Sequence, residues 1–323
     1  MRITLIILAL FCSMKCHCQI HKAQAGDLQA TISCYKLTQH AEGLPEKNPA
    51  VSLHGTEVRQ LNSKIIDGME YQIYVSLPDH YESSTESYPV LYFLDAWAQF
   101  GIIRQTYWLL RFYDEVPPLI IVGIAYEGSA KDHLFYRSRD YSPTRVPKEK
   151  LGQISKIVPT SGGAPDFVRF LEKELFPMIE KEYRVNKSDR ALFGVSFGGL
   201  CSTYVLFKHN HLFQRYFIGS PSLWWDNEII FKYEEDYAKN NASLPVKIFL
   251  AAGGKENLSI RYNKLRDRLL SRNYNDLEFT STIFENETHM SFIPAAHTRA
   301  LRVLYNSEEK AKYGQKENKF QDI

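Results

Sequence analysis

The sequence contains few cysteines, little net charge and no long apolar run after its first residues. Neither the five cysteines nor the ten histidines in 323 residues show the paired spacing of zinc sites, so we expect no metal ion. A formal net charge of +2 gives no electrostatic reason to expect nucleic acid or an anionic membrane as a partner. No stretch after the N-terminus is apolar for the ~18 residues that a spanning helix needs. A hydrophobic content of 44% nevertheless suffices for a sizeable globular core.

The first eighteen residues differ from the rest of the chain. Arg2 is followed by an apolar run from Ile3 to Phe11 and then by small and polar residues up to Cys18. This order is typical of a secretory signal peptide. A lipoprotein signal is disfavoured because no small residue precedes any of the three cysteines in this segment. We therefore predict a signal peptide over residues 1–18 and a secreted or periplasmic protein.

The remaining chain divides into three parts by composition. Residues 19–54 form an N-terminal extension that no pattern assigns, and residues 55–306 are predicted to form one catalytic domain. The charged tail over residues 307–323 is expected to be disordered. Removal of the signal peptide would leave Cys34 and Cys201. Because Cys201 lies in an apolar stretch, we expect it to be a small buried hydrophobic residue, although an oxidising compartment would permit a disulfide.

Apolar runs bounded by polar loops recur along the predicted domain. An alternating pattern predicts a strand at Glu70–Leu77, and further strands are predicted at Pro89–Leu94, Leu119–Ala125, 190–195, Tyr216–Gly219, Val246–Ala252 and Leu277–Phe284. Helical periods fall at Asp166–Glu182, with an interruption at Pro177, and at 199–207, Ile260–Leu270 and Pro294–Tyr305. Continuous apolar strands that alternate with helices favour an α/β fold, a doubly wound, mostly parallel sheet with helices on both faces.

A glycine-flanked serine is the most informative motif. The segment Gly194–Gly198 contains Ser196 between a short apolar run and an apolar helix. This order is typical of a nucleophile elbow, in which the serine lies on a strained turn with its hydroxyl exposed. Glycine is expected before and after the serine because a side chain there would collide with neighbouring backbone. The motif predicts a serine hydrolase and therefore requires a base, a carboxylate and an oxyanion hole.

A histidine and a carboxylate should follow the nucleophile in this fold. His289 lies just after the last predicted strand, at the sheet edge where ligands bind in open α/β sheets, and is the candidate base. His297 belongs to the last helix and is not expected to reach this edge. Glu256, in the loop after the strand at 246–252, is the favoured acid, and Asp226 is the competing one.

An oxyanion hole needs two backbone N–H groups. The residue after the nucleophile, Phe197, should supply one of them. The loop after the strand at 89–94 should supply the other, from Ala96 or Trp97. The sequence does not decide between these two.

Five ordered segments resemble the putative esterase (esterase D) family of α/β-hydrolases. They are Tyr88–Asp95, Arg137–Thr144, Gly162–Tyr183, Gly194–Gly199 and Ser220–Trp225, the last resembling the SPSLWW loop of the siderophore-esterase branch. The resemblance spans roughly residues 55 to 306 and implies an α/β-hydrolase fold. It departs from the family at Ala96, where glycine is usual.

The resemblance also implies a function. The family hydrolyses siderophore trilactones, cinnamoyl or acetyl esters of polysaccharides, and S-formylglutathione. Substrate-binding roles are implied for Arg137, Arg139, Trp224 and Trp225, because a cationic aromatic pocket suits charged catecholates. We therefore predict a serine carboxylic ester hydrolase that needs no cofactor and acts on a small-molecule or glycan-linked ester. A feruloyl or acetyl esterase, a peptidase or acyltransferase, and a non-catalytic ligand-binding protein remain alternatives, and the oligomeric state is left open.

Overall fold

Eight strands form one sheet in the computed structural model, which describes residues 52–256 and 259–305. The strands are β1 (Thr56–Asn62), β2 (Glu70–Ser76), β3 (Tyr88–Phe93), β4 (Ile120–Tyr126), β5 (Val185–Val195), β6 (Arg215–Gly219), β7 (Lys247–Gly253) and β8 (Glu278–Phe284). Their order is β1-β2-β4-β3-β5-β6-β7-β8. The six strands from β4 to β8 in this order are parallel, whereas β1 and β2 add to the edge by antiparallel pairing.

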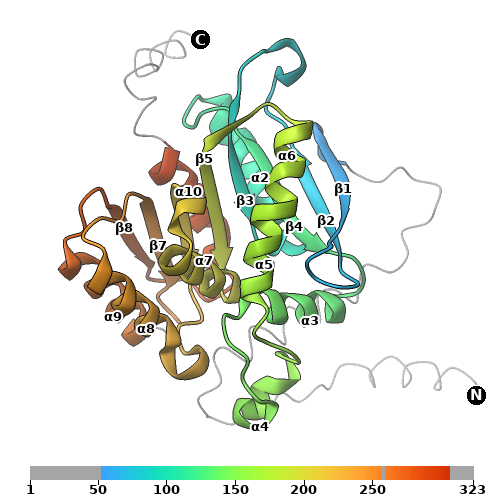
Figure 1. The fold of residues 1–323 in the computed structure, drawn as a ribbon. Helices are drawn as coiled ribbons and strands as arrows, with labels where there is room; N and C mark the ends of the chain where they lie inside the picture. The colour runs from blue at the N-terminus through green and yellow to red at the C-terminus, as the bar shows by residue number, and fades with distance from the viewer. Residues whose placement is uncertain (1–51, 257–258, 306–323) are drawn as a thin grey trace, which may run out of the picture.

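Helices cover both faces of the sheet (Figure 1). On one face lie α2 (Ala96–Phe112) and α10 (Phe292–Tyr305). On the other lie α3 (Ala130–Tyr141), α5 (Ala164–Phe170), α6 (Phe176–Glu182), α7 (Phe197–Lys208), α8 (Trp225–Asn240) and α9 (Ser259–Arg272), and the short α4 (Lys148–Leu151) follows α3 along the chain. Alternate residues of β3 point to opposite faces of the sheet. Val90 and Tyr92 belong to the core on the α7 side, and Leu91 and Phe93 belong to the core on the α2 side. This is the predicted α/β-hydrolase fold.

The helix predicted over Asp166–Glu182 consists of three segments. A π-helical turn, η4 (Leu171–Leu175), separates α5 from α6, and Pro177 is the second residue of α6. Proline lacks an N–H to donate, and its ring crowds the preceding turn of an α-helix. The wider π turn directly before Pro177 accommodates both effects, so the helical register changes there without ending the helix.

Several elements were not assigned from sequence. β1 is an edge strand with three successive exposed residues and no inside–outside alternation. α8 contains three consecutive residues with positive φ, Asp226, Asn227 and Glu228, so its start carries no regular helical period. The residue before α2, Asp95, has a positive φ, and its side chain makes no capping hydrogen bond to the helix. These elements depend on tertiary packing more than on local preference.

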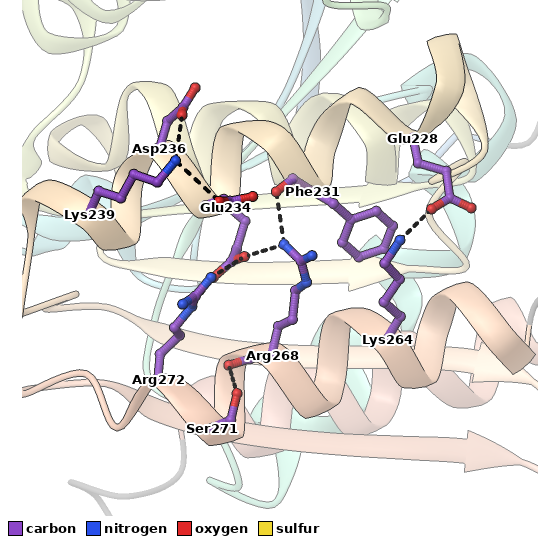
Figure 2. Close-up of polar contacts among 10 residues, drawn as sticks. Glu228, Phe231, Glu234, Asp236, Lys239, Lys264, Arg268, Ser271 and Arg272 are labelled. Atoms are coloured by element: carbon purple, nitrogen blue, oxygen red, sulfur yellow. Dashed lines mark hydrogen bonds and ion pairs between the residues drawn. The ribbon is translucent and has the colours of Figure 1, made fainter.

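The outer helices α8 and α9 are joined by charged contacts (Figure 2). The fully buried Glu234 accepts hydrogen bonds from Arg268 at 2.8 Å and from Arg272 at 2.7 Å. Near the start of α9, Lys264 donates to Glu228 at 2.5 Å. A buried carboxylate is tolerated only when it is paired in this way. These contacts therefore hold α9 against α8, and α9 begins shortly after the loop that contains Glu256.

His297 lies in the core, as its place in the last helix suggested. Its ring packs edge-on against Phe217 at 5.8 Å between centroids, and only 2% of the residue is exposed. Burial lowers the pKa of His297 to about 4. A histidine enclosed in the core in this way has no open side from which a substrate could be reached.

The buried His297 is expected to make folding sensitive to acid. The unfolded chain binds a proton at this residue near pH ~6.5, whereas the folded chain keeps it neutral down to about pH 4. The free energy of unfolding should therefore fall by up to about 1.4 kcal/mol per pH unit between these values as pH decreases. Urea unfolding of the wild type and of His297→Met at pH 7 and pH 5 tests this. Between pH 7 and pH 5, the free energy of unfolding should fall by about 2 kcal/mol less in the variant than in the wild type. Equal decreases in the two proteins would contradict the prediction.

Some predictions concern parts of the chain that the structure leaves undescribed. The predicted signal peptide, nearly all of the N-terminal extension, Cys34 and the predicted disordered tail lie outside the described residues. Cys201 is described and is fully buried on α7, as predicted. None of the helices within residues 52–256 and 259–305 combines the length and apolar character that crossing a bilayer requires.

Candidate active site

Ser196 lies on a sharp turn between β5 and α7. Its φ of 60° and ψ of −117° are strained for a residue with a side chain. Its N–H donates to the Gly219 carbonyl at 2.9 Å, which fixes the turn against β6. The structure therefore gives Ser196 the backbone geometry of a nucleophile elbow.

Two glycines around the serine allow this close packing. A Cβ at Gly194 would lie 2.2 Å from the Gly198 carbonyl oxygen, and one at Gly199 would lie 2.7 Å from the Gly219 carbonyl oxygen. At Gly198 the nearest atom would be 3.4 Å away, which is ordinary contact. The prediction of a collision was therefore right for Gly194 and wrong for Gly198. The second position at which a side chain would collide is Gly199, where the backbone of α7 approaches that of β6.

His289 and Glu256 meet at the carboxyl edge of the sheet. The Nδ1 atom of His289, after β8, lies 2.6 Å from Oε2 of Glu256, after β7. The second carboxylate oxygen accepts hydrogen bonds from the Ser220 hydroxyl at 2.6 Å and the Gly253 N–H at 2.8 Å. With a proton on Nδ1, the Nε2 atom is left as the acceptor. The structure thus places Glu256 beside His289, whereas Asp226 belongs to the separate helix α8.

The predicted oxyanion donors lie at two helix starts. Phe197 is the first residue of α7, and Ala96 and Trp97 are the first two of α2. The first N–H groups of a helix have no partner within that helix. Ala96 does not need the backbone freedom of glycine here, because the positive φ of 57° lies at Asp95 and not at Ala96. The Ala96 methyl occupies space against Gly123, where an added Cβ would be 2.7 Å away.

One pocket brings the nucleophile and the histidine together. It is bounded by the ends of β3 and β5 and the starts of α2, α3 and α10, and its lining residues are Asp95, Trp97, Ala98, Gln99, Ala130, Leu134, Arg137, Val195, Ser196, His289, Met290 and Ile293. Most of these side chains are apolar. Sequence patterns did not indicate Leu134 and Ile293, since apolar residues in helices are usually core residues. Met290 lies in the turn before α10 and is 42% exposed, and no motif marked it.

The four predicted substrate-binding residues are placed differently. Arg137 lines the pocket and forms an ion pair with Asp95 at 2.7 Å. Burial disfavours its charge, but Asp95 outweighs this and raises the pKa of Arg137. Arg139 pairs with the buried Asp140 at 2.6 Å and does not line this pocket.

The two tryptophans pack behind the elbow. Trp225 is fully buried, and its indole N–H donates to the Thr144 hydroxyl at 3.0 Å. The rings of Trp224 and Trp225 lie 6.0 and 5.4 Å from that of Phe197, measured between centroids. They therefore support the residue that follows Ser196, and the open pocket lies elsewhere.

Comparison with known proteins agrees with this fold and with esterase activity. The profile of the family described as "Putative esterase" matches residues 63–298. The ferri-bacillibactin esterase BesA of Bacillus subtilis is 34% identical over 266 residues, which cover 78% of this chain and 90% of that protein. The BES protein of Bacillus cereus has a TM-score of 0.69 at 32% identity, covering 80% of this chain and 99% of that one. An IroE-like serine hydrolase from Shewanella oneidensis has a TM-score of 0.67 at 28% identity, covering 77% and 80%. The chain therefore belongs to this esterase family and is an esterase with an α/β-hydrolase fold.

Proposed function

We propose that this esterase is a secreted or periplasmic serine hydrolase of siderophore esters, with Ser196, His289 and Glu256 as its triad. The observation that carries the proposal is the 2.6 Å contact between His289 and Glu256, beside the pocket that Ser196 also lines. The serine-hydrolase and siderophore-esterase names of the relatives support the same chemistry. The sequence of residues 1–18 supports the location outside the cytoplasm.

Acylation follows from the placement of these groups. The Ser196 hydroxyl oxygen attacks the ester carbonyl carbon while Nε2 of His289 takes the hydroxyl proton. Glu256 holds the imidazolium that forms, and its other oxygen is fixed by Ser220 and Gly253. The N–H of Phe197 and one from the start of α2 stabilise the oxyanion. The tetrahedral intermediate then breaks its bond to the alcohol, which leaves with the proton from His289.

Water completes the reaction by the same path. His289 removes a proton from a water molecule, whose oxygen attacks the acyl carbon bound to Ser196. The second tetrahedral intermediate then breaks its bond to the Ser196 oxygen, which takes the proton back from His289, and the carboxylic acid is released. In a cyclic triester, each cycle opens one ester bond and leaves an acid and an alcohol.

The apolar part of the pocket is the surface on which aromatic groups of the substrate would pack. Trp97, Leu134 and Met290 line it. Aromatic rings bind well to such surfaces when a few polar groups orient the reacting bond. This assigns aromatic contacts to Trp97 rather than to Trp224 and Trp225, which contact Phe197.

The substrate class is tested by comparing two esters. We expect kcat/KM for a ferric catecholate trilactone to exceed that for methyl ferulate by about 100-fold, because differences in pocket contacts discriminate substrates on this scale. Chromatographic separation of substrate and hydrolysed products measures both rates, with Ser196→Ala as the blank.

The other outcomes would each reject this substrate class. A preference for methyl ferulate would favour an esterase of polysaccharide side chains. Tight binding of the trilactone with no hydrolysis, and no adduct of a fluorophosphonate probe at Ser196, would favour a non-catalytic binding protein.

A further inference from the structure

Arg137 reaches from α3 to the base of the pocket and contacts Asp95 with two parallel hydrogen bonds. Its Nε donates to Oδ1 at 2.7 Å and its Nη2 donates to Oδ2 at 2.9 Å. The exposed fractions of the two side chains are only 13% and 6%. A bidentate pair of this kind fixes the relative orientation of its two groups and neutralises their charges. Arg137 is therefore poorly suited to attract a charged substrate.

Asp95 has an unusual backbone conformation just before the predicted oxyanion donors. Its φ of 57° and ψ of 38° are left-handed, a region that costs free energy for a residue with a side chain. Two groups of α3 hold it there: Arg137 binds its carboxylate, and the Tyr141 hydroxyl accepts its backbone N–H at 3.2 Å. The residues that follow at once are Ala96 and Trp97, so the orientation of their N–H groups depends on Asp95.

The same guanidinium also contacts the other half of the predicted oxyanion hole. It lies 5.6 Å from the ring centroid of Phe197, within cation–π range. The Asp95 carboxylate lies beside Gly198, where an added Cβ would be 3.4 Å from Oδ2. Asp95 and Arg137 thus form a continuous contact between the start of α2 and the start of α7.

We infer that the Asp95–Arg137 pair is a positioning device that sets the two oxyanion N–H groups relative to each other. The inference rests on the proposed function, since it assumes that Ser196 forms a tetrahedral oxyanion. Binding of the ester ground state does not require this alignment, whereas the transition state does. Loss of the pair should therefore lower kcat and change KM little.

The test compares a neutral and an anionic ester with the same leaving group, p-nitrophenyl acetate and mono-p-nitrophenyl succinate. Arg137→Gln is expected to lower kcat about 100-fold on both, the scale seen when one oxyanion donor is lost. Asp95→Asn should give a similar loss, and the double variant should be no worse than either single one. Arg137→Lys keeps the charge but not the two parallel bonds, so it should be as impaired as Arg137→Gln.

Recognition of substrate charge would give the opposite pattern. It predicts a higher KM for the anionic ester alone, near-normal activity of Arg137→Lys, and no loss in Asp95→Asn, and any of these results would overturn the inference. Arg169→Gln and Asp166→Asn, which break an exposed Arg–Asp pair on α5, are matched controls expected to leave kcat unchanged.

Stability and nucleophile controls separate the remaining explanations. Melting temperatures identify a variant that fails to fold, and the conservative Arg137→Lys and Asp95→Asn then decide the outcome. If Ser196→Ala abolishes turnover but both conservative variants keep the wild-type kcat, only the positioning role is overturned. Turnover that survives Ser196→Ala would overturn the proposed function and this inference together.

Discussion

Replacing Ser196 by alanine is expected to lower kcat for p-nitrophenyl acetate by about 10⁶-fold, the effect of removing the nucleophile from a Ser–His–acid triad. Without the hydroxyl, no acyl-enzyme forms, and only the oxyanion hole and binding remain to accelerate attack by water. Release of p-nitrophenol measures the rate. Mass spectrometry after treatment with a fluorophosphonate should show an adduct on the wild type at Ser196 and none on the variant.

A second serine, on the strand that leads into the elbow, provides the control. Ser188 lies on β5 in an exposed position, so Ser188→Ala should retain both turnover and labelling. Alanine at 196 also removes no buried packing, and the melting temperature should stay near that of the wild type. Full turnover by a folded Ser196→Ala protein would refute the proposed mechanism.

Replacing Glu256 by glutamine should lower kcat by about 10⁴-fold, as when the carboxylate of a serine triad becomes an amide. The amide oxygen would stay with Ser220 and Gly253, which both donate hydrogen bonds to the present carboxylate oxygen. The amide nitrogen would then face Nδ1 of His289 and favour the tautomer with its proton on Nε2. In that tautomer His289 cannot accept the serine proton.

Asp226 supplies the matched comparison, because it was the competing carboxylate in the sequence. Asp226→Asn should leave kcat within about twofold, as expected for a side chain outside the triad. Asparagine also tolerates the positive φ of 43° at this position. A larger loss in Asp226→Asn than in Glu256→Gln would reverse the assignment of the acid.

The central strands could be predicted from sequence because they are buried on both faces. A continuous apolar run such as Leu91–Leu94 has few conformations that remove it from water, and a parallel sheet is one of them. The outer elements gave weaker signals. β1 has exposed residues, and α8 starts with left-handed residues that only contacts with neighbouring elements hold in place.

Local sequence patterns were enough to predict the order of the candidate groups: a serine on a tight turn, then an acid, then a histidine, each after a strand. Packing in three dimensions decided which carboxylate meets His289 and which of the two arginines lines the pocket. Arg137 and Arg139 have the same charge in sequence, yet Asp95 binds one and Asp140 the other. Arg139 pairs with its neighbour in the chain, whereas the Arg137–Asp95 pair joins residues far apart in sequence and therefore depends on how α2, α3 and the sheet pack. Local sequence patterns do not encode that packing.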